Sequence, residues 1–182
     1  GMVNLMGGKE KVIADLEDFF NKTPQSFMWN SYYNHANEPV HHVPFLFNRL
    51  GVPWLTQKWT RIICDSAYHN SVEGLVGNED VGQMSAWYVL ASIGIHPVCP
   101  GSTRFEITSP LFKSASIRLP DGKNFSVIAK NNSASNIYID SALLNGKPYN
   151  KSDIDYFDIM KGGVLELIMS DKPNKYRALN DE

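Results

Sequence analysis

The sequence is poor in the residues that mark several specialised protein classes. Among 182 residues it has only two cysteines, Cys64 and Cys99, which are too far apart for a CxxC motif and too few for a disulfide framework. Its 17 Lys and Arg against 19 Asp and Glu give a net charge of −2, without the basic excess that binding to nucleic acid or to an anionic membrane normally needs. We therefore expect neither nucleic acid nor a membrane among its partners.

Long hydrophobic runs are also missing. The apolar run from Met84 to Ile95 is shorter than the roughly 20 residues that span a bilayer, and it contains Ser85 and Ser92. Residues 1–11 lack the long apolar core and cleavage site of a secretion signal, so we expect no signal peptide there. Hydrophobic residues still make up 43% of the chain, which is enough to build the core of one domain or of two small ones.

The hydrophobic period of the sequence changes near residue 100. Before that point, helical spacing predicts a helix over 9–21, an apolar segment over 39–50, a helix opened by Pro53 and a helix over 81–93. After Gly101, short β-rich runs alternate with turn sequences such as DGK and NGKPY, which predicts an antiparallel sheet. Helices followed by strands predict an α+β fold, with a helical region over residues 1–100 and a β-sheet region over 101–182.

Two stretches concentrate polar residues, YNHANEPVHHVPFLFN at 33–48 and GLVGNEDVGQMSAWYVLASIGIHPVCPG at 74–101. Both have an ordinary structural explanation. Asp80 could cap the N-terminus of a helix, with Gln83 as its reciprocal partner in a capping box. Asn37 or Glu38 could cap a helix in the same way, since a proline follows at a position that suits the first turn.

The same side chains could instead form a ligand site. His41 and His42 are neighbours whose side chains point about 100° apart in a helix. No HExxH motif is present either, and both observations argue against zinc. Asn37, Glu38 and Asp80 offer oxygen atoms, which suit a hard cation, above all calcium. The residue types alone leave capping and cation binding both open.

Together, the two stretches resemble the C-terminal part of the α-mannosidases of glycoside hydrolase family 92. The resemblance continues through PLFKSASIRLPDGKNFSVIAKNNSASNIYIDSALLNGKPYNKSDI to the end of the chain. It implies a calcium-dependent exo-α-mannosidase that hydrolyses α-1,2-linked mannosides with inversion, in the periplasm, at the cell surface or outside the cell. It also implies that residues 1–100 are the last helical hairpins of an (α/α)6 toroid, followed by the antiparallel β-rich region.

The resemblance assigns catalytic work to the GNEDVG sequence at residues 77–82. An inverting glycosidase needs one carboxylic acid for the leaving oxygen and one carboxylate that activates water. By its position in the motif, Asp80 is expected to be this catalytic base. Asn78 stands where relatives carry an aspartate and would help to position water or substrate, and Glu79 would also contact the substrate.

The resemblance assigns ligand contacts to the first polar stretch. Glu38, together with Asn37, is expected to contact a calcium ion that engages the mannose hydroxyls and favours a distorted sugar ring. His41 and His42 would line the sugar pocket or support the ligands from behind. Mannose-containing glycans are therefore the expected partners.

The sequence departs from the family pattern in one respect. The general acid of the family lies upstream of the NEP sequence, and no carboxylate in a matching context precedes it here. Glu10, Asp15, Glu17 and Asp18 fit the solvated face of the first helix instead. We expect a truncated C-terminal fragment that is incomplete as a catalyst by itself, and whose exposed helix faces need the missing N-terminal domain or self-association.

Two alternatives to an enzyme remain at this point. The chain could be a non-catalytic carbohydrate-binding or assembly module that binds sugar through calcium without turnover. It could also be a structural domain whose polar clusters are only helix caps. A change of Glu38 to Gln that leaves calcium affinity intact would favour the structural reading.

Overall fold

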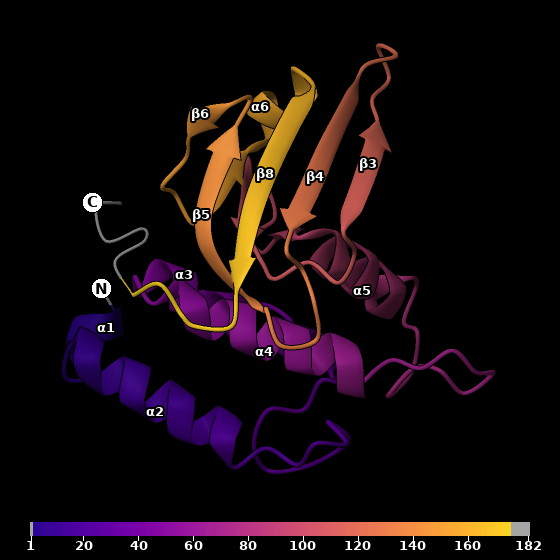
Figure 1. Cartoon of the computed structure of the whole chain (residues 1–182). Helices are drawn as coiled ribbons and strands as arrows, with labels where there is room; N and C mark the ends of the chain where they lie inside the picture. Colours follow the sequence, from indigo (N-terminus) through magenta and orange to yellow (C-terminus); the bar gives the residue numbers. More distant parts are fainter. Residues whose placement is uncertain (1, 176–182) are drawn as a thin grey trace.

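The computed structural model describes residues 2–175. Most helices occupy one side of the molecule and most strands the other, while one short helix lies among the strands (Figure 1). In chain order the helical elements are α1 (Met2–Leu5), α2 (Lys9–Asn21), η1 (Glu38–Val40), η2 (Val43–Phe45), α3 (Leu46–Arg49), α4 (Pro53–Ser66), α5 (Gln83–Ile93) and α6 (Tyr156–Met160). The strands are β1 (Ile95–Pro97), β2 (Arg104–Ile107), β3 (Ser114–Arg118), β4 (Asn124–Lys130), β5 (Tyr138–Leu144), β6 (Lys147–Pro148), β7 (Asp153–Asp155) and β8 (Gly163–Ser170).

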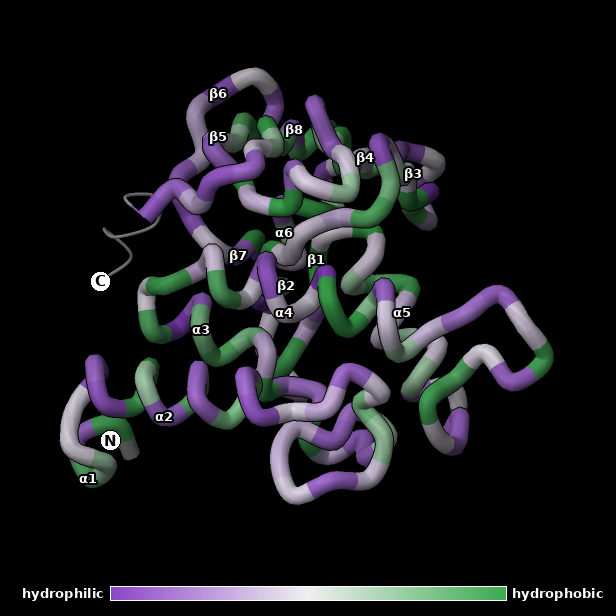
Figure 2. The backbone as a smooth tube through the Cα atoms, turned by 60° about the horizontal axis from the view of Figure 1, so that its bottom comes forward, coloured by the Kyte–Doolittle hydropathy of each residue, from purple (hydrophilic) through white to green (hydrophobic). Residues whose placement is uncertain are grey.

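The helices confirm the predicted periods with two differences. Helix α2 has the bounds expected from its apolar spacing, and hydrophilic and hydrophobic residues alternate along it (Figure 2). The segment over 39–50 forms two 3₁₀ turns and a single helical turn, because Pro39 and Pro44 remove backbone donors from a longer helix. Helix α5 begins two residues later than expected, at Gln83. Among residues 2–175 no helix is long and apolar enough to cross a membrane.

The strands form two sheets. One has five strands in the order β3-β4-β8-β5-β6, and the other has three in the order β1-β2-β7. The expectation of a purely antiparallel region is wrong for one pair, because β4 and β8 run parallel, from Phe125 opposite Gly163 to Lys130 opposite Ile168. Helix α6 and the β7 strand lie in the connection between these neighbours. The larger sheet is therefore mixed.

The buried apolar residues form two clusters. The helical cluster runs from Phe20 to Ala91, and the sheet cluster runs from Ile95 to Met169. In Figure 1 the larger sheet stands over α4 and α5, while α2 lies on the far side of α4. The sheet cluster begins at Ile95, so β1 lies within the region 1–100 that was expected to be helical, and the division into two domains stays a prediction.

A buried arginine on α4 joins the helices to the loops of the sheet. Arg61 donates from Nη2 to Ser109 Oγ at 3.1 Å, to Asn132 Oδ1 at 2.7 Å and to the carbonyl oxygen of Pro110. Its Nη1 also donates to the carbonyl oxygen of Ser133 at 3.4 Å. Burial removes water from the guanidinium and lowers its pKa, but the group stays charged. These acceptors make the hydrogen bonds that water would otherwise make. Arg61 therefore fixes the position of the sheet on α4.

Candidate functional site

The first polar stretch is anchored by a buried histidine. Tyr33 Oη lies 2.8 Å from His35 Nδ1, and His35 Nε2 lies 2.7 Å from Tyr68 Oη. Tyr68 donates its own proton to the carbonyl oxygen of Met84 at 3.1 Å, so the hydrogen between His35 and Tyr68 must sit on Nε2. Tyr33 then donates to Nδ1. His35 is thus a neutral imidazole with both nitrogens used, and burial keeps its pKa well below the usual value.

His41 connects this stretch to helix α5. Its Nε2 donates to the carbonyl oxygen of His35 at 2.9 Å, and its Nδ1 accepts from Gln83 Nε2 at 3.2 Å. The imidazole rings of His35 and His41 stack with centroids 4.4 Å apart. The indole of Trp87 donates to the carbonyl oxygen of His41 at 3.1 Å and is fully buried, so it belongs to the core and offers no sugar platform. Burial lowers the pKa of His41.

A cavity of about 550 Å³ opens beside these contacts. From the sequence-predicted site residues it brings together Glu38, His41 and His42. His41 is almost completely buried and His42 is exposed, and both neighbours line the cavity. The remaining lining residues are Gln83, His96, Pro97, Val98, Cys99, Pro100, Gly101, Ser102, Thr103, Phe105 and Tyr156. Asn37, Asn78, Glu79 and Asp80 do not line it.

Asp80 does not line the cavity itself, but it lies beside Glu38, which does. The carboxyl group of Asp80 lies beside that of Glu38, whose hydrogen bond raises the pKa of Asp80, with desolvation and the charges of Glu38 and Glu79 adding to the effect. Asp80 and Val81 have φ angles of 47° and 59°, a left-handed conformation that non-glycine residues rarely adopt. Two consecutive residues of this kind turn the chain sharply and are typical of functional loops.

The helix cap differs from the predicted one. Gly82, with φ 87°, is the N-cap of α5, so Asp80 lies too far from the helix to cap it, and Gln83 contacts His41 instead. Glu79 caps the first turn of α5 instead. Its Oε1 accepts from the backbone N–H of Ser85 at 3.1 Å, and its Oε2 accepts from the Ser85 hydroxyl at 2.6 Å. These bonds lower the pKa of Glu79. Its role as a substrate contact, like that of exposed Asn78, stays a prediction.

Two side-chain oxygens of the first stretch are buried without partners. Glu38 Oε1 is buried without a hydrogen-bond partner, and so is the side-chain oxygen of Asn34. Such uncompensated oxygens are costly unless a ligand, water or ion meets them, and oxygen is the donor that calcium prefers. Within residues 2–175, no group of three or more His, Cys, Asp and Glu side chains is placed to hold a metal ion. The calcium contacts expected of Glu38 and Asn37 therefore stay a prediction.

Gln83 and Tyr156 line the cavity and were missed as site residues. Gln83 lies in the second polar stretch, so the density of polar side chains was its signal. Gln83 was assigned to a cap because its spacing from Asp80 fits a capping box. Tyr156 comes from a short helix after β7, and nothing in its local sequence shows that it reaches this cavity.

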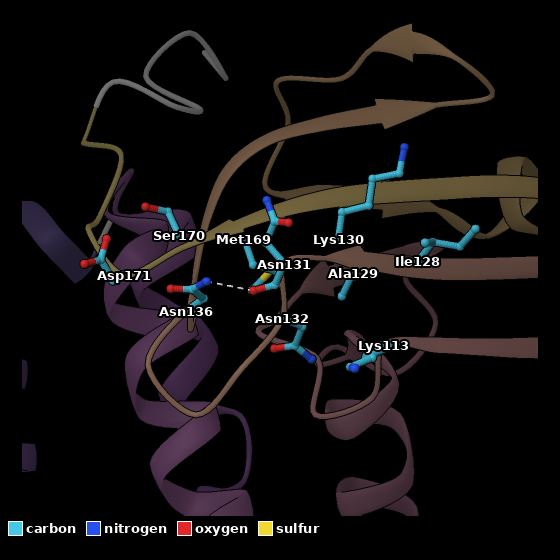
Figure 3. A pocket seen from close by; sticks show the side chains of 10 residues that line it. All are labelled: Lys113, Ile128, Ala129, Lys130, Asn131, Asn132, Asn136, Met169, Ser170 and Asp171. Atoms are coloured by element: carbon cyan, nitrogen blue, oxygen red, sulfur yellow. Dashed lines mark hydrogen bonds between the residues drawn. The ribbon is translucent and has the colours of Figure 1, made fainter.

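A second cavity, of about 750 Å³, lies at one end of β4 and β8 (Figure 3). None of the sequence-predicted site residues lines it. Its asparagines hold the loop together, since Asn136 Nδ2 donates to the carbonyl oxygen of Asn131 at 2.8 Å and Asn132 Nδ2 to that of Pro110 at 3.0 Å. Lys130 is paired with Glu166. The polar side chains around this cavity therefore stabilise the loop and the strand ends.

The cavity thus gathers a carboxylate, two histidines and an amide, with a second carboxyl group beside the first. The chain matches the model of the glycosyl hydrolase family 92 catalytic domain over residues 1–171. The chain therefore belongs to glycosyl hydrolase family 92. A secreted glycosidase of Arthroderma benhamiae is 31% identical over 178 residues, which are 96% of this chain and 22% of that protein.

Solved structures agree with this family. A family GH92 alpha-mannosidase from Bacteroides thetaiotaomicron superimposes with a TM-score of 0.89 at 42% identity, covering 96% of this chain and 23% of that chain. A family GH92 inverting mannosidase from the same organism gives a TM-score of 0.86 at 38% identity, covering 96% of this chain and 26% of that chain. The chain thus spans about a quarter of the length of these relatives.

Proposed function

We propose that this chain carries part of the active site of a calcium-dependent, inverting exo-α-mannosidase that hydrolyses α-1,2-linked mannosides. The observation that carries the proposal is the cavity that gathers Glu38, His41, His42 and Gln83, with Asp80 beside Glu38. Support comes from the relatives, which include an alpha-mannosidase and an inverting mannosidase of the same family. The (α/α)6 toroid to which α2, α4 and α5 would belong is part of the same proposal.

Asp80 would be the base that takes a proton from the attacking water. Its raised pKa makes it a better proton acceptor than an ordinary aspartate, at the cost of being protonated at a higher pH. Asn78 would orient this water, because an amide cannot take the proton. Glu38 and Asn37 would hold calcium, and the ion would supply positive charge for the mannose hydroxyls. As calcium ligands, Glu38 and Asn37 would not take part in proton transfer.

Turnover would need residues outside the described part of the chain. The two carboxylates of an inverting glycosidase lie about 6.5–9.5 Å apart, which leaves room for water. The carboxyl group of Glu38 lies beside that of Asp80 and raises its pKa, so we do not take the two as that pair. Glu38 is also the sole carboxylate among the residues that line the described cavity. We therefore place the general acid elsewhere in the family 92 catalytic domain and propose that the chain alone is inactive.

The partners and the location follow from the same proposal. Mannose-containing glycans would bind in the cavity, and the rest of the catalytic domain or a second copy of the chain would cover the exposed helix faces. A periplasmic, surface or secreted location is supported by the secreted relative from Arthroderma benhamiae.

A chimaera tests the proposal. The corresponding quarter of the alpha-mannosidase that is 42% identical would be replaced by this chain, and mannose release from α-1,2-linked mannobiose would be measured with calcium and with a chelator. We expect calcium-dependent release that falls about 10²- to 10⁴-fold in Asp80→Asn. Asp140→Asn, an exposed aspartate on β5, should leave it unchanged. An Asp80→Asn chimaera of full activity, or release by the isolated chain, would contradict the assignment.

A further inference from the structure

The larger sheet ends in two edges of different character. One edge is β6, which consists only of Lys147 and Pro148. Both residue types protect an edge, because proline lacks a backbone donor and the lysine charge resists burial. The other edge is β3, a strand of five residues that is the outermost one on its side of the sheet (Figure 1). It pairs with β4 in an unbroken register, and its sequence SASIR contains neither proline nor lysine, so this edge is unprotected.

The backbone groups that point outward from β3 belong to alternate residues. The N–H of Ala129 donates to the carbonyl oxygen of Lys113 at 2.9 Å, next to one end of the strand. The N–H of Leu119 donates to that of Lys123 at 2.8 Å, next to the other end. Both pairs keep the register of the β3–β4 ladder, so the odd-numbered residues of β3 bond to β4 and the even-numbered ones turn their N–H and C=O groups away from it. The even-numbered residues are Ser114, Ser116 and Arg118. No other described residue donates to or accepts from their backbone groups.

These outward groups are complementary to a second copy of the same strand. In an antiparallel pair with a two-fold axis at Ser116, each Ser116 exchanges two hydrogen bonds with its own copy. Ser114 then lies opposite Arg118 of the second chain and exchanges two more with it. Each strand contributes three donors and three acceptors, and every donor meets an acceptor. The pairing therefore leaves no outward group of β3 unused.

The side chains suit the same register. Ala115 and Ile117 are half-buried and face the sheet cluster, and Ile117 lies opposite Ala115 of the second copy, which extends this apolar face. On the outer face, Ser116 Oγ accepts from Ser126 Oγ at 3.1 Å, which leaves the Ser116 proton for the serine opposite. The two copies of Arg118 lie at opposite ends of the pair, roughly 14 Å apart by the rise of an antiparallel strand. At that distance salt screens their repulsion.

We propose that two copies of the chain associate through β3, antiparallel and two-fold about Ser116, so that their larger sheets join into one continuous sheet. One pair of five-residue strands is smaller than a standard interface of about 1,600 Å², so the dimer dissociates on dilution. No residue of β3 lines the cavity of the candidate site. The interface is therefore separate from the proposed function and from the exposed helix faces.

Sedimentation velocity over a range of chain concentrations tests this dimer. The unmodified chain should pass from monomer to dimer as its concentration rises. Ser116→Pro should raise the dissociation constant at least about tenfold, because each dimer loses two hydrogen bonds. The proline is compatible with the monomer, since the N–H that it removes points away from β4. Ser116→Thr is the matched control, because it keeps the backbone donor and should dimerise like the unmodified chain.

A charge exchange at the same position tests the two-fold axis. Ser116→Lys and Ser116→Glu should each weaken the dimer, because like charges then face each other across the axis. An equal mixture of the two variants should associate again, since a lysine of one chain then faces a glutamate of the other. The same two substitutions at Ser31, an exposed residue in the helical half, should have no effect.

Three results would overturn the dimer and leave the proposed function standing. The first is an unmodified chain that stays monomeric throughout the concentration range. The second is a dimer that Ser116→Pro leaves unchanged, which would place self-association on another surface. The third is a mixture of Ser116→Lys and Ser116→Glu that associates no better than either variant alone.

Discussion

Gln83 donates a hydrogen bond from Nε2 to Nδ1 of His41 at 3.2 Å, and the other nitrogen of His41 donates to the carbonyl oxygen of His35. A carbonyl oxygen can only accept, so the His41 proton sits on Nε2 and Nδ1 must accept. This fixes the orientation of the Gln83 amide and leaves its oxygen for the cavity. A residue interpreted from the sequence as a cap partner thus contacts His41 and lines the cavity.

The first prediction concerns Gln83→Glu. A carboxylate facing Nδ1 of His41 brings two acceptors together, and only protonation of the imidazole restores a hydrogen bond. The pKa of His41 should therefore rise above its lowered value in the native protein, as measured by NMR titration of the imidazole. Gln83→Ala is the control, because it removes the amide without adding charge. Identical titration of His41 in the two variants would contradict the contact.

The second prediction concerns stability at acidic pH. Burial lowers the pKa of His96 to about 4, and the ring stacks on Phe45 with centroids 4.6 Å apart. A histidine in the unfolded chain has a pKa of about 6.5, so below that pH the unfolded state binds a proton that the folded state does not. The free energy of unfolding should therefore fall as the pH drops from about 6.5 towards 4. His96 alone should contribute about 2 kcal/mol of this loss by pH 5.

Urea unfolding at pH 7 and pH 5 measures this loss. In His96→Phe, whose ring can still stack on Phe45, the decrease between the two pH values should be smaller than in the unmodified chain. His69→Asn is the control, since His69 is exposed and its removal should not change the decrease. An undiminished loss in His96→Phe would show that the acid sensitivity has another source.

The sequence predicted the regular elements better than their assembly. Helices α2 and α4 follow from apolar spacing and from Pro53 at a helix start, and both were found where expected. The parallel pairing of β4 and β8 was missed, because a period of two shows a strand but does not identify its partner. Strands β1 and β7 were missed because three residues are too short to show a period.

The site was predictable in its components and not in their arrangement. The density of polar residues pointed to Glu38, His41 and His42, which do line one cavity. The capping role of Asp80 was wrong, because the left-handed backbone at residues 80–82 places Gly82 at the helix start. Tyr156 enters only through the tertiary structure, since β2 and β7 pair to bring α6 to the cavity.

The third prediction concerns Arg61→Met. Methionine keeps much of the volume of the side chain but leaves Asn132 Oδ1 and the other acceptors without their donor. The free energy of unfolding should fall by about 2–4 kcal/mol in urea titrations. Arg118→Met, at an exposed position of β3, should change it by no more than about 0.5 kcal/mol. Equal effects of the two substitutions would contradict the role of Arg61 as the link between α4 and the sheet.

The fourth prediction concerns calcium. If Glu38 contributes an oxygen to the ion, Glu38→Gln removes a negative charge from the donor set and should weaken calcium binding at least about tenfold in calorimetry. Glu73→Gln changes an exposed loop carboxylate and serves as the control. Unchanged affinity in Glu38→Gln would remove this residue from the metal site and would favour a purely structural role for the first polar stretch.

The most direct test of the account is mannose binding by the chain, measured by NMR with calcium and again with a chelator. We expect mannose to perturb the resonances of His42 and Gln83 when calcium is present, with no change in the chelator or in Glu38→Gln. Mannose binding that persists unchanged in the chelator and in Glu38→Gln, or that leaves His42 and Gln83 unperturbed, would contradict the claim that this cavity is part of a calcium-dependent mannosidase active site.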